Sequence, residues 1–176
     1  MTHAAQPEQV TLAEAKPSDA ALLANLLELY IHDLSAAFPA IELGLDGRFG
    51  YGKLPLYWSE PESRFPFLIR YGDRVVGFAL VTRGSPASAE PDVFDIAEFF
   101  VIRRYRRSGV GQRAALLVWD RFPGRWTVRV SEGNTGALPF WNRIIAEYTS
   151  NTAAESTRAG NPHAWRVYSF ESRRLA

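Results

Sequence analysis

Apolar positions follow two spacings along this chain, one typical of helices and one typical of strands. Residues 16–30 place apolar side chains on a single helical stripe, with Ser18 as the expected N-cap. A second helical piece is expected at residues 31–37. Further helices are expected over residues 109–122 and 136–148, since both stretches repeat their apolar residues at helical spacing.

Shorter apolar runs bounded by turn residues predict the strands. A hairpin is expected over residues 65–84, because Gly72-Asp73 separates two strand-like runs. Residues 39–64 contain glycines, prolines and aromatics without periodicity, and we expect a loop there. The other expected strands are 10–15, 93–102, 125–130 and 165–170. This order predicts an α/β fold with a parallel strand pair in the middle of the sheet.

Length and composition favour an ordinary globular domain. The chain has 176 residues, of which 47% are apolar and 22% charged, so we expect one domain over residues 1–176 with residues 1–9 flexible. The net charge of +1 argues against a nucleic-acid partner. Without cysteine, the chain forms no disulfide, thiolate metal site or cysteine nucleophile.

The remaining sequence signals predict a cytoplasmic protein with no membrane-spanning segment and no metal site. The first residues lack a signal-peptide pattern, and the most apolar stretch, residues 20–31, is too short to span a bilayer. His3 and His163 have no partners at metal-ligand spacing. His32 and Asp33 are adjacent on a helix and point about 100° apart, so they are not expected to form a dyad.

The segment "RRYRRSGVG", residues 103–111, concentrates four arginines and two glycines directly after an apolar strand. A strand that enters a helix through a glycine turn exposes backbone N–H groups at the positive end of the helix dipole. Gly109 and Gly111 allow close approach to the backbone, and arginine adds fixed charge. The segment predicts a phosphate-binding turn, and the alternative is a solvated basic turn.

Other anion-binding motifs fit this segment less well. No Gly-Lys-Ser or Gly-Lys-Thr follows, which excludes a P-loop. "GVGQRA" matches the dinucleotide fingerprint G-x-G-x-x-A, and Glu132 follows about twenty residues later. However, six residues separate Ile102 from Gly109, and only 44 residues follow Glu132. A nucleic-acid site is disfavoured because aromatic and basic residues are not interleaved here.

With R/Q-x-x-G-x-G/A filled by Arg106, Gly109 and Gly111, the stretch "AEFFVIRRYRRSGVGQRAALLVWDRF" resembles the central motif of the GNAT N-acetyltransferase superfamily. "SEGNTGALPFWNRII" resembles the later N-x-x-A-x-x-F-Y motif of that family, and "LAEAKPSDAALLANL" resembles its opening strand and helix. These segments occur in family order from about residue 10 to residue 147. The resemblance implies a mixed, mostly antiparallel central sheet flanked by helices, in which the parallel fourth and fifth strands splay apart.

The resemblance also implies acetyl-CoA as co-substrate and a set of residues that bind it. The backbone of Phe99, Phe100 and Val101 would bind the pantetheine arm, and Asn134 and Phe140 would line its far side. Asn134 is equally natural as a helix N-cap. The turn expected to hold the pyrophosphate consists of Arg106, Arg107, Ser108, Gly109, Val110 and Gly111.

Glu98 is the candidate catalytic base. It is the one charged residue between Ile96 and Ile102, so burial in the strand should raise its pKa toward a useful value. It also matches a position at which the family often carries a catalytic glutamate. The alternative is a structural carboxylate paired with Arg129 on the next strand.

The general acid is where the sequence departs from the family pattern. Trp141 stands where a tyrosine often follows the phenylalanine of the later motif, and indole has no titratable proton. We expect Trp141 to pack in the core. Either Tyr105 or Tyr148 protonates the leaving thiolate, or no acid is needed because a thiol pKa near about 8.5 makes the thiolate a tolerable leaving group.

These features predict an N-acetyltransferase that moves acetyl from acetyl-CoA to an amine by direct attack in a ternary complex. A non-catalytic acyl-CoA sensor is the first alternative, and a small dinucleotide-binding protein the second. The acceptor is a small molecule or peptide, and a homodimer is compatible with the sequence. Residues 39–64 are expected to cap the acceptor cleft or to form a solvated loop. Their acidic and aromatic residues, Tyr51, Tyr57, Trp58, Glu60 and Glu62, would suit a cationic amine.

Overall fold

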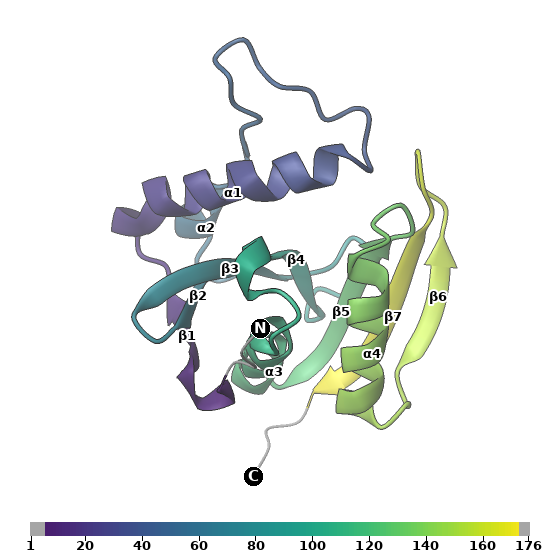
Figure 1. The fold of residues 1–176 in the computed structure, drawn as a ribbon. Coiled ribbons are helices and arrows are strands. Elements are labelled where there is room, and N and C mark those ends of the chain that lie inside the picture. Colours follow the sequence, from purple (N-terminus) through teal and green to yellow (C-terminus); the bar gives the residue numbers. More distant parts are fainter. Residues whose placement is uncertain (1–5, 173–176) are drawn as a thin grey trace.

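The computed structural model describes residues 6–172, which form a single sheet with helices on both faces (Figure 1). The strands are β1 (Val10–Glu14), β2 (Arg64–Tyr71), β3 (Arg74–Arg83), β4 (Phe94–Val101), β5 (Gly124–Ser131), β6 (Ala154–Arg158) and β7 (Trp165–Ser172). The helices are α1 (Ala20–Ser35), α2 (Leu56–Ser59), α3 (Val110–Arg121) and α4 (Ala137–Thr149), with 3-10 turns at Pro7–Gln9, Pro17–Asp19 and Arg103–Tyr105.

The seven strands lie in the order β1-β2-β3-β4-β5-β7-β6. All neighbouring pairs are antiparallel except β4 and β5, which are parallel. Their pairing is limited to Phe94 with Trp126 and Asp95 with Thr127. Beyond these residues the two strands diverge and leave their facing backbone edges unpaired, which confirms the predicted mixed sheet with a splayed parallel pair.

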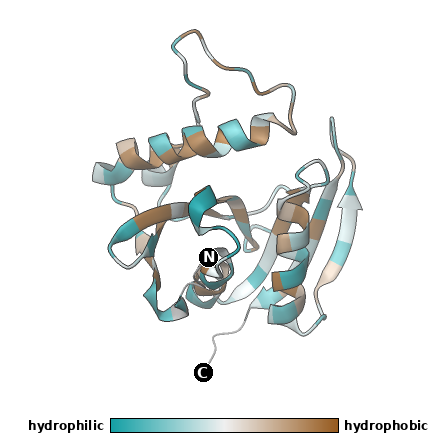
Figure 2. Cartoon of the chain, in the orientation of Figure 1, coloured by the Kyte–Doolittle hydropathy of each residue, from teal (hydrophilic) through white to brown (hydrophobic). Residues whose placement is uncertain are grey.

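Apolar side chains pack on both faces of the sheet. On one face, α1 and the short α2 contribute Leu23, Leu27 and Tyr57 to a cluster with Phe78 and other residues of the strands. On the other face, helices α3 and α4 pack their buried residues against the strands in two further clusters. Figure 2 shows the hydrophobic stripes of α1 and α4. The sheet is therefore the middle of three layers, and a site at the β4–β5 opening is reachable from both faces.

The start and the length of the first helix differ from the prediction. Ser18 is not its N-cap, because residues 17–19 form a 3-10 turn and α1 begins at Ala20. The Asp19 carboxylate instead accepts a hydrogen bond from the Lys16 backbone N–H at 2.9 Å. The separate helical piece expected at residues 31–37 is wrong, since α1 continues without a break to Ser35.

Three other segments complete the comparison with the sequence-based elements. The expected loop 39–64 contains α2, and its last residue begins β2. Strand β6 was not predicted, because each of its residues is exposed and so shows no apolar alternation. Of the segment 1–9 expected to be flexible, residues 1–5 lie outside the described part of the chain, as does His3, and residues 7–9 form a 3-10 turn.

Candidate active site

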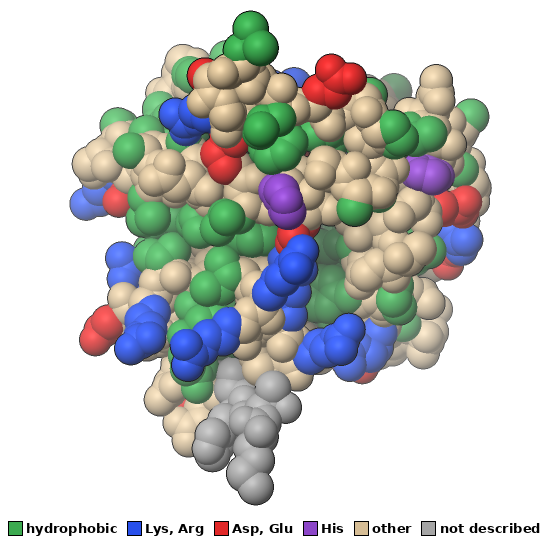
Figure 3. Space-filling view, turned by 45° about the horizontal axis from the view of Figure 1, so that its top comes forward, with side chains coloured by type: hydrophobic (Ala, Val, Ile, Leu, Met, Phe, Trp, Pro, Cys, Tyr) green, Lys and Arg blue, Asp and Glu red, His purple; other side chains and the backbone are tan. Residues whose placement is uncertain are grey.

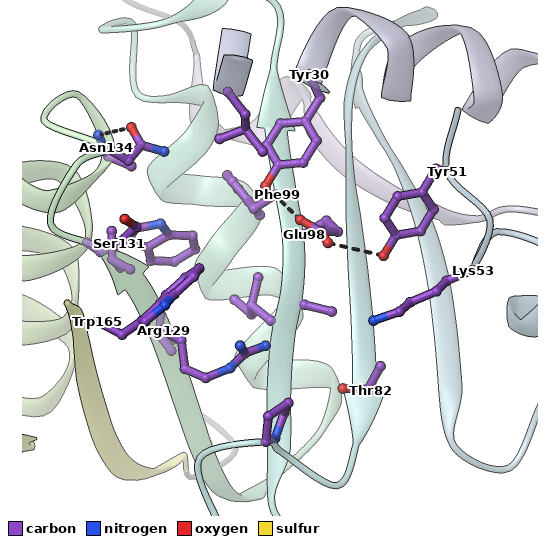
Figure 4. A pocket seen from close by; sticks show the side chains of 18 of the residues that line it. Tyr30, Tyr51, Lys53, Thr82, Glu98, Phe99, Arg129, Ser131, Asn134 and Trp165 are labelled. Atoms are coloured by element: carbon purple, nitrogen blue, oxygen red, sulfur yellow. Dashed lines mark hydrogen bonds between the residues drawn. The ribbon is translucent and has the colours of Figure 1, made fainter. Parts of the chain in front are cut away.

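A β-bulge in β4 sets the position of Glu98. Leu80 on β3 pairs with Glu98, whereas the next residue, Val81, pairs with Ile96, so Ala97 is an extra residue on β4. Bulges of this kind redirect a side chain and often occur next to active sites. The Glu98 carboxylate accepts a hydrogen bond from the Tyr30 hydroxyl at 2.6 Å and another from the Tyr51 hydroxyl at 3.1 Å (Figure 4).

Burial dominates the protonation behaviour of this group. It raises the pKa of Glu98 above the ordinary value, although the hydrogen bonds from Tyr30 and Tyr51 and the positive charges of Arg129 and Lys53 act in the opposite direction. Burial, followed by the negative charge of Glu98, raises the pKa of Tyr30 and of Tyr51 far above the usual value. Both phenols therefore stay protonated and donate to a carboxylate whose affinity for a proton is increased by burial.

Arg129 is paired with a different carboxylate from the one that the sequence offered as an alternative. Its guanidinium donates to Asp95 through Nε at 2.8 Å and Nη2 at 2.9 Å, in a two-point contact. Asp95 is fully buried and also accepts hydrogen bonds from Ser85 at 2.5 Å and Thr127 at 2.8 Å. The alternative in which Arg129 neutralises Glu98 as its ion-pair partner is therefore wrong. The Asp95–Arg129 pair instead joins β4 to β5 where they begin to diverge.

A cavity of about 520 Å³ connects the β4–β5 opening with the space beneath α1 and the segment that leads into α2. Glu98 lies in its wall, together with Tyr30, Tyr51 and Tyr57. Residues of both diverging strands line it as well, from Ile96 to Phe99 on β4 and from Val128 to Ser131 on β5 (Figure 4). A group entering between the strands and a group entering from the α1 side would thus meet near Glu98.

The turn after β4 has the backbone geometry of an anion site. Residues 107 to 112 have no protein acceptor for their backbone N–H groups within the described chain, and the first such bond of α3 is from Arg113 to the Gly109 carbonyl. Arg107 and Gly109 adopt left-handed conformations, with φ of 60° and 92°. Alternating conformations of this kind gather successive N–H groups into a concave anion nest at a helix N-terminus.

Gly111 serves a second purpose in the same turn. A Cβ at this position would lie 3.3 Å from the Phe140 ring, so the absence of a side chain allows the first turn of α3 to approach α4 closely. Phe140 also stacks on Phe99, with ring centroids 6.2 Å apart. The predicted turn and the predicted Phe140 therefore lie next to each other.

The side chain of Arg106 is bound to the protein itself. Its Nε donates to the Val101 carbonyl at 2.6 Å, its Nη2 pairs with Asp33 at 2.5 Å, and its guanidinium lies over the Phe100 ring. Arg103 also pairs with Asp33, at 2.6 Å. The sequence did not predict a His32-Asp33 dyad, and the Asp33 carboxylate forms salt bridges with Arg103 and Arg106 instead. In this conformation the turn offers backbone N–H groups rather than the Arg106 side chain to an anion.

The basic side chains of this turn contribute to a charged surface. The Arg103 side chain is 75% exposed and the Arg106 side chain 40% exposed. Although burial raises the pKa of Asp33, hydrogen bonds from Arg106 and Arg103 lower it below its ordinary value. Figure 3 shows several basic side chains across the middle and lower part of one face, with a recess lined by hydrophobic side chains beside them.

The three β4 residues expected to bind pantetheine differ in the direction of their backbone groups. Ile102 donates its N–H to Val76 on β3, and in an antiparallel ladder successive residues direct these groups to opposite sides. Phe100 therefore faces β3, as Ile102 does, whereas Phe99 and Val101 face the opening toward β5. Since the Val101 carbonyl accepts from Arg106, Phe99 offers the freer backbone edge.

Of the two later-motif residues expected to line the cofactor, Asn134 lies in the cavity wall and Phe140 does not. The Asn134 side-chain oxygen accepts a hydrogen bond from the Ala137 N–H at 3.1 Å, so it satisfies an N–H group in the first turn of α4. Its side chain also lines the cavity, and its amide nitrogen is directed away from α4 in Figure 4. Trp141 is buried against Trp119 and Phe99, as expected for core packing.

Several residues proposed from the sequence for other roles lie away from the cavity. Tyr105 packs on Tyr71, and Tyr148 packs on Trp119, so neither candidate acid lines it. Of the residues expected to cap the acceptor cleft, Tyr51 and Tyr57 line the cavity. Trp58 donates to the Ala15 carbonyl, Glu60 pairs with Arg64, and Glu62 is exposed.

Tyr30 and Lys53 are among the residues of the cavity wall that sequence reasoning missed. Tyr30 was assigned only to the apolar stripe of the first helix.

Within residues 6–172, no helix combines the length and the hydropathy that crossing a bilayer requires. In the same residues, His, Asp and Glu side chains form no group of three or more that could hold a metal ion.

Comparison with known proteins identifies the class that this fold and site define. Residues 23–145 match the family model described as the acetyltransferase (GNAT) family. This match spans more than half of the chain, and the chain therefore belongs to that family. No curated protein matches the sequence.

Solved structures support the same fold at low sequence identity. An acetyltransferase from Thermus thermophilus superposes with a TM-score of 0.68 at 20% identity, covering 93% of this chain and 97% of that one. Spermidine N-acetyltransferase from Vibrio cholerae, in complex with CoA and spermine, gives 0.65 at 12% identity, covering 94% and 96%. The Salmonella typhimurium protein yncA, with its cofactor acetyl-CoA, gives 0.63 at 11% identity, covering 96% of each chain.

Proposed function

We propose that this protein is an N-acetyltransferase that transfers the acetyl group of acetyl-CoA to an amine by direct attack in a ternary complex. The observation that carries the proposal is the position of Glu98. This carboxyl group, whose pKa is raised by burial, lines the cavity that joins the β4–β5 opening to the α1 side. The family membership of the chain and the acetyl-CoA of the Salmonella relative support the choice of co-substrate.

The residues of the opening fit an acyl-CoA in chemical terms. The backbone N–H groups of residues 107 to 112 would hold the diphosphate. The outward-facing backbone of Phe99 would bind the pantetheine arm as an added strand does, and could polarise the thioester carbonyl through its N–H. When bound, acetyl-CoA supplies an acyl group activated as a thioester.

Glu98 would act as the base in this scheme. It accepts a proton from the attacking amine, either directly or through a water molecule, while Tyr30 and Tyr51 hold its carboxylate in place. The amine nitrogen forms a bond to the carbonyl carbon, the carbon–sulfur bond breaks, and CoA leaves as the thiolate. A thiol pKa near about 8.5 allows this departure without an enzymic acid.

The cavity tyrosines do not suit the role of a strong acid. The raised pKa of Tyr30 and of Tyr51 means that each holds its proton more tightly than a free phenol. Burial also raises the pKa of Tyr57, to about 12. We therefore assign Tyr30 and Tyr51 to the positioning of Glu98, and we leave protonation of the thiolate to solvent.

A non-catalytic acyl-CoA-binding module is the second candidate. The observation that favours it is Trp141, which occupies the position where the family often carries a tyrosine and has no proton to donate at useful pH. Turnover separates the two functions, because a sensor binds acetyl-CoA but releases no CoA when amines are added.

The test is steady-state release of CoA with a panel of amines, comparing wild type with Glu98→Gln across pH. We expect Glu98→Gln to lower kcat/KM by about 10²-fold or more, since general bases contribute roughly 10²–10⁴-fold. The loss should be largest where wild-type Glu98 is ionised and should shrink at low pH, where its carboxyl group is protonated and no longer acts as a base. Glu62→Gln, an exposed carboxyl in the same region, is the matched control.

Calorimetric binding of acetyl-CoA to both variants separates catalysis from binding, and we expect its affinity to be unchanged. A pH–rate profile of Glu98→Gln that overlays the wild type would show that Glu98 is structural. Absence of turnover with every amine, together with tight acetyl-CoA binding, would favour the sensor.

A further inference from the structure

The charges around the cavity are predominantly positive. Glu98 is the one acidic side chain in its described wall, which also contains four basic residues: Lys53, Arg64, Arg83 and Arg129. This balance is opposite to the expectation from residues 39–64, whose acidic side chains were expected to attract a cationic amine. The charge that this wall offers to a ligand therefore depends on which of the four basic residues lack a carboxylate partner.

Three of the four basic residues are already neutralised by carboxylates. Arg64 pairs with Glu60 at 2.6 Å, Arg83 with Asp92 at 2.7 Å and Arg129 with Asp95 at 2.8 Å. Within residues 6–172, Lys53 has no carboxylate within salt-bridge distance. Its ammonium group is thus the one cation of the described wall without a salt-bridge partner, although its charge also acts on Glu98.

The geometry directs this charge into the cavity. Lys53 lies in the segment between Tyr51 and α2, and its side chain extends toward β4 and Thr82 (Figure 4). Arg129 approaches β4 from the opposite side, on β5 (Figure 4). Its Nε and Nη2 bind Asp95, whereas Nη1 has no acceptor within the described residues. Two cationic groups therefore flank β4 on the side where Glu98 receives its tyrosines.

We propose that the acceptor carries a carboxylate or phosphate group in addition to its amine, and that Lys53, assisted by Nη1 of Arg129, binds this acidic group while Glu98 faces the amine. This inference rests on the proposed acetyl transfer and specifies its substrate class. An amine with a second positive charge would meet the like charge of Lys53. Because Lys53 is exposed, solvent weakens this repulsion, which still disfavours a diamine relative to an amine that carries an acidic group. The cavity thus selects amino acids, or amines bearing a phosphate, over diamines.

The decisive experiment compares matched acceptors that differ in the acidic group alone. The pairs are β-alanine and β-alaninamide, 4-aminobutyrate and 4-aminobutanamide, phenylalanine and phenylalaninamide, and phosphoethanolamine and ethanolamine. We expect higher kcat/KM for the acidic member of at least one pair, and low activity with 1,4-diaminobutane. The carboxylate pairs and the phosphate pair show separately which acid the site takes.

Substitution of Lys53 assigns the preference to this residue. Lys53→Gln should lower kcat/KM for the acidic acceptor about ten- to a hundredfold more than for its neutral partner, the range expected for a hydrogen bond to a charged group. The change with the neutral partner reports the separate loss of the Lys53 charge near Glu98. Lys53→Glu should shift the preference toward 1,4-diaminobutane. Lys16→Gln alters the one other lysine of the chain and should behave as wild type.

Binding without turnover separates this inference from the proposed function. Calorimetric titration of the same acids and amides into the protein saturated with CoA, which has no acetyl group to transfer, measures the subsite alone. Lys53-dependent binding of an acid without acetylation of any amine would support the subsite and overturn the acetyl transfer. If turnover occurs with equal kcat/KM for amides and acids, or if Lys53→Gln does not change kcat/KM for the acids, the subsite alone is overturned. Binding of no acid would likewise overturn it.

Discussion

Opposing effects determine the pKa of the Glu98 carboxyl group. Burial in β4 raises its pKa, while two phenol hydroxyls and two nearby cations limit the rise. The phenols come from α1 and from the segment before α2, so the protonation of a residue on the sheet depends on how these segments cover it.

Removal of one phenol hydroxyl should move the pH dependence of the reaction in a defined direction. The hydrogen bond from Tyr30 stabilises the ionised form of Glu98 and lowers its pKa, so Tyr30→Phe raises that pKa further. If Glu98 is the base that we propose, it acts when ionised, and the acidic limb of the kcat/KM profile should shift to higher pH. Tyr71→Phe, away from the cavity, is the control.

The pH–rate profile distinguishes positioning from packing. A uniform fall in rate at all pH values, with an unmoved acidic limb, would mean that Tyr30 supports the fold rather than the protonation state of Glu98. Unchanged kinetics of Tyr30→Phe would show that the Tyr30 hydroxyl has no role in the reaction.

At the scale of elements, the Asp95–Arg129 pair holds β4 and β5 together at the end where they are paired. Asp95 is fully buried and Arg129 is largely buried, with 22% of its side chain exposed. Removing one member of a buried pair leaves an uncompensated charge, which costs about 3–5 kcal/mol. We therefore expect Asp95→Asn to lower the free energy of unfolding by that amount in urea denaturation.

A double variant tests the reason for this loss. Asp95→Asn combined with Arg129→Met removes both charges and should lose much less stability than Asp95→Asn alone. A single variant that costs less than about 1 kcal/mol would contradict the assignment of this pair as the junction of the two strands.

The turn between β4 and α3 is the second element with a testable role. Gly109 has φ of 92° and open space around the position of a Cβ, so Gly109→Ala introduces backbone strain of about 1–2 kcal/mol without a clash. We expect this strain to distort the N–H groups of residues 107 to 112 and to weaken acetyl-CoA binding about tenfold or more by calorimetry.

The hairpin glycine Gly72 provides a matched control, because it also has positive φ, 56°, and open space. Gly72→Ala should cost similar stability and leave the acetyl-CoA dissociation constant unchanged. Equal affinity of wild type and Gly109→Ala for acetyl-CoA would contradict the anion-binding role of the turn.

The sequence predicts the elements that local patterns determine and misses those that depend on distant contacts. The hairpin at Gly72-Asp73 and the turn at Gly109 were predictable because glycine marks special backbone conformations. Strand β6 was not, since an exposed edge strand has no apolar alternation. Ser18 failed as an N-cap because it lies inside the 3-10 turn Pro17–Asp19, and the helix begins only after Asp19.

In the candidate site, too, residues marked by a local sequence pattern could be predicted, and residues that depend on distant contacts could not. Glu98 could be identified because a lone carboxylate in an apolar strand is conspicuous. Its partner Tyr30 lies 68 positions away in the chain, and its helical spacing indicated nothing except core packing. Lys53 occurs in an aperiodic segment, where local sequence does not indicate the direction of a side chain. A signal for it does exist, since the chain uses only two lysines among its 20 basic residues.

At the scale of the whole molecule, the diverging β4–β5 pair lets two entrances meet at one carboxyl group. The donor turn and Phe99 lie toward α3 and α4, whereas Tyr30, Tyr51 and Lys53 lie toward α1 and α2. Asp33 links the two parts, because it connects α1 to Arg103 and Arg106 of the turn. In the proposed function, this arrangement would bring the acyl donor and the amine together from opposite faces of the sheet.

The most direct test of this account is the thermal stability of the protein with and without acetyl-CoA, with NAD as the control ligand. At about 100 times its dissociation constant, acetyl-CoA should stabilise the folded state by roughly 2.7 kcal/mol, whereas NAD should have no effect. A shift with acetyl-CoA alone would agree with the proposed donor site. No shift, or an equal shift with NAD, would contradict it.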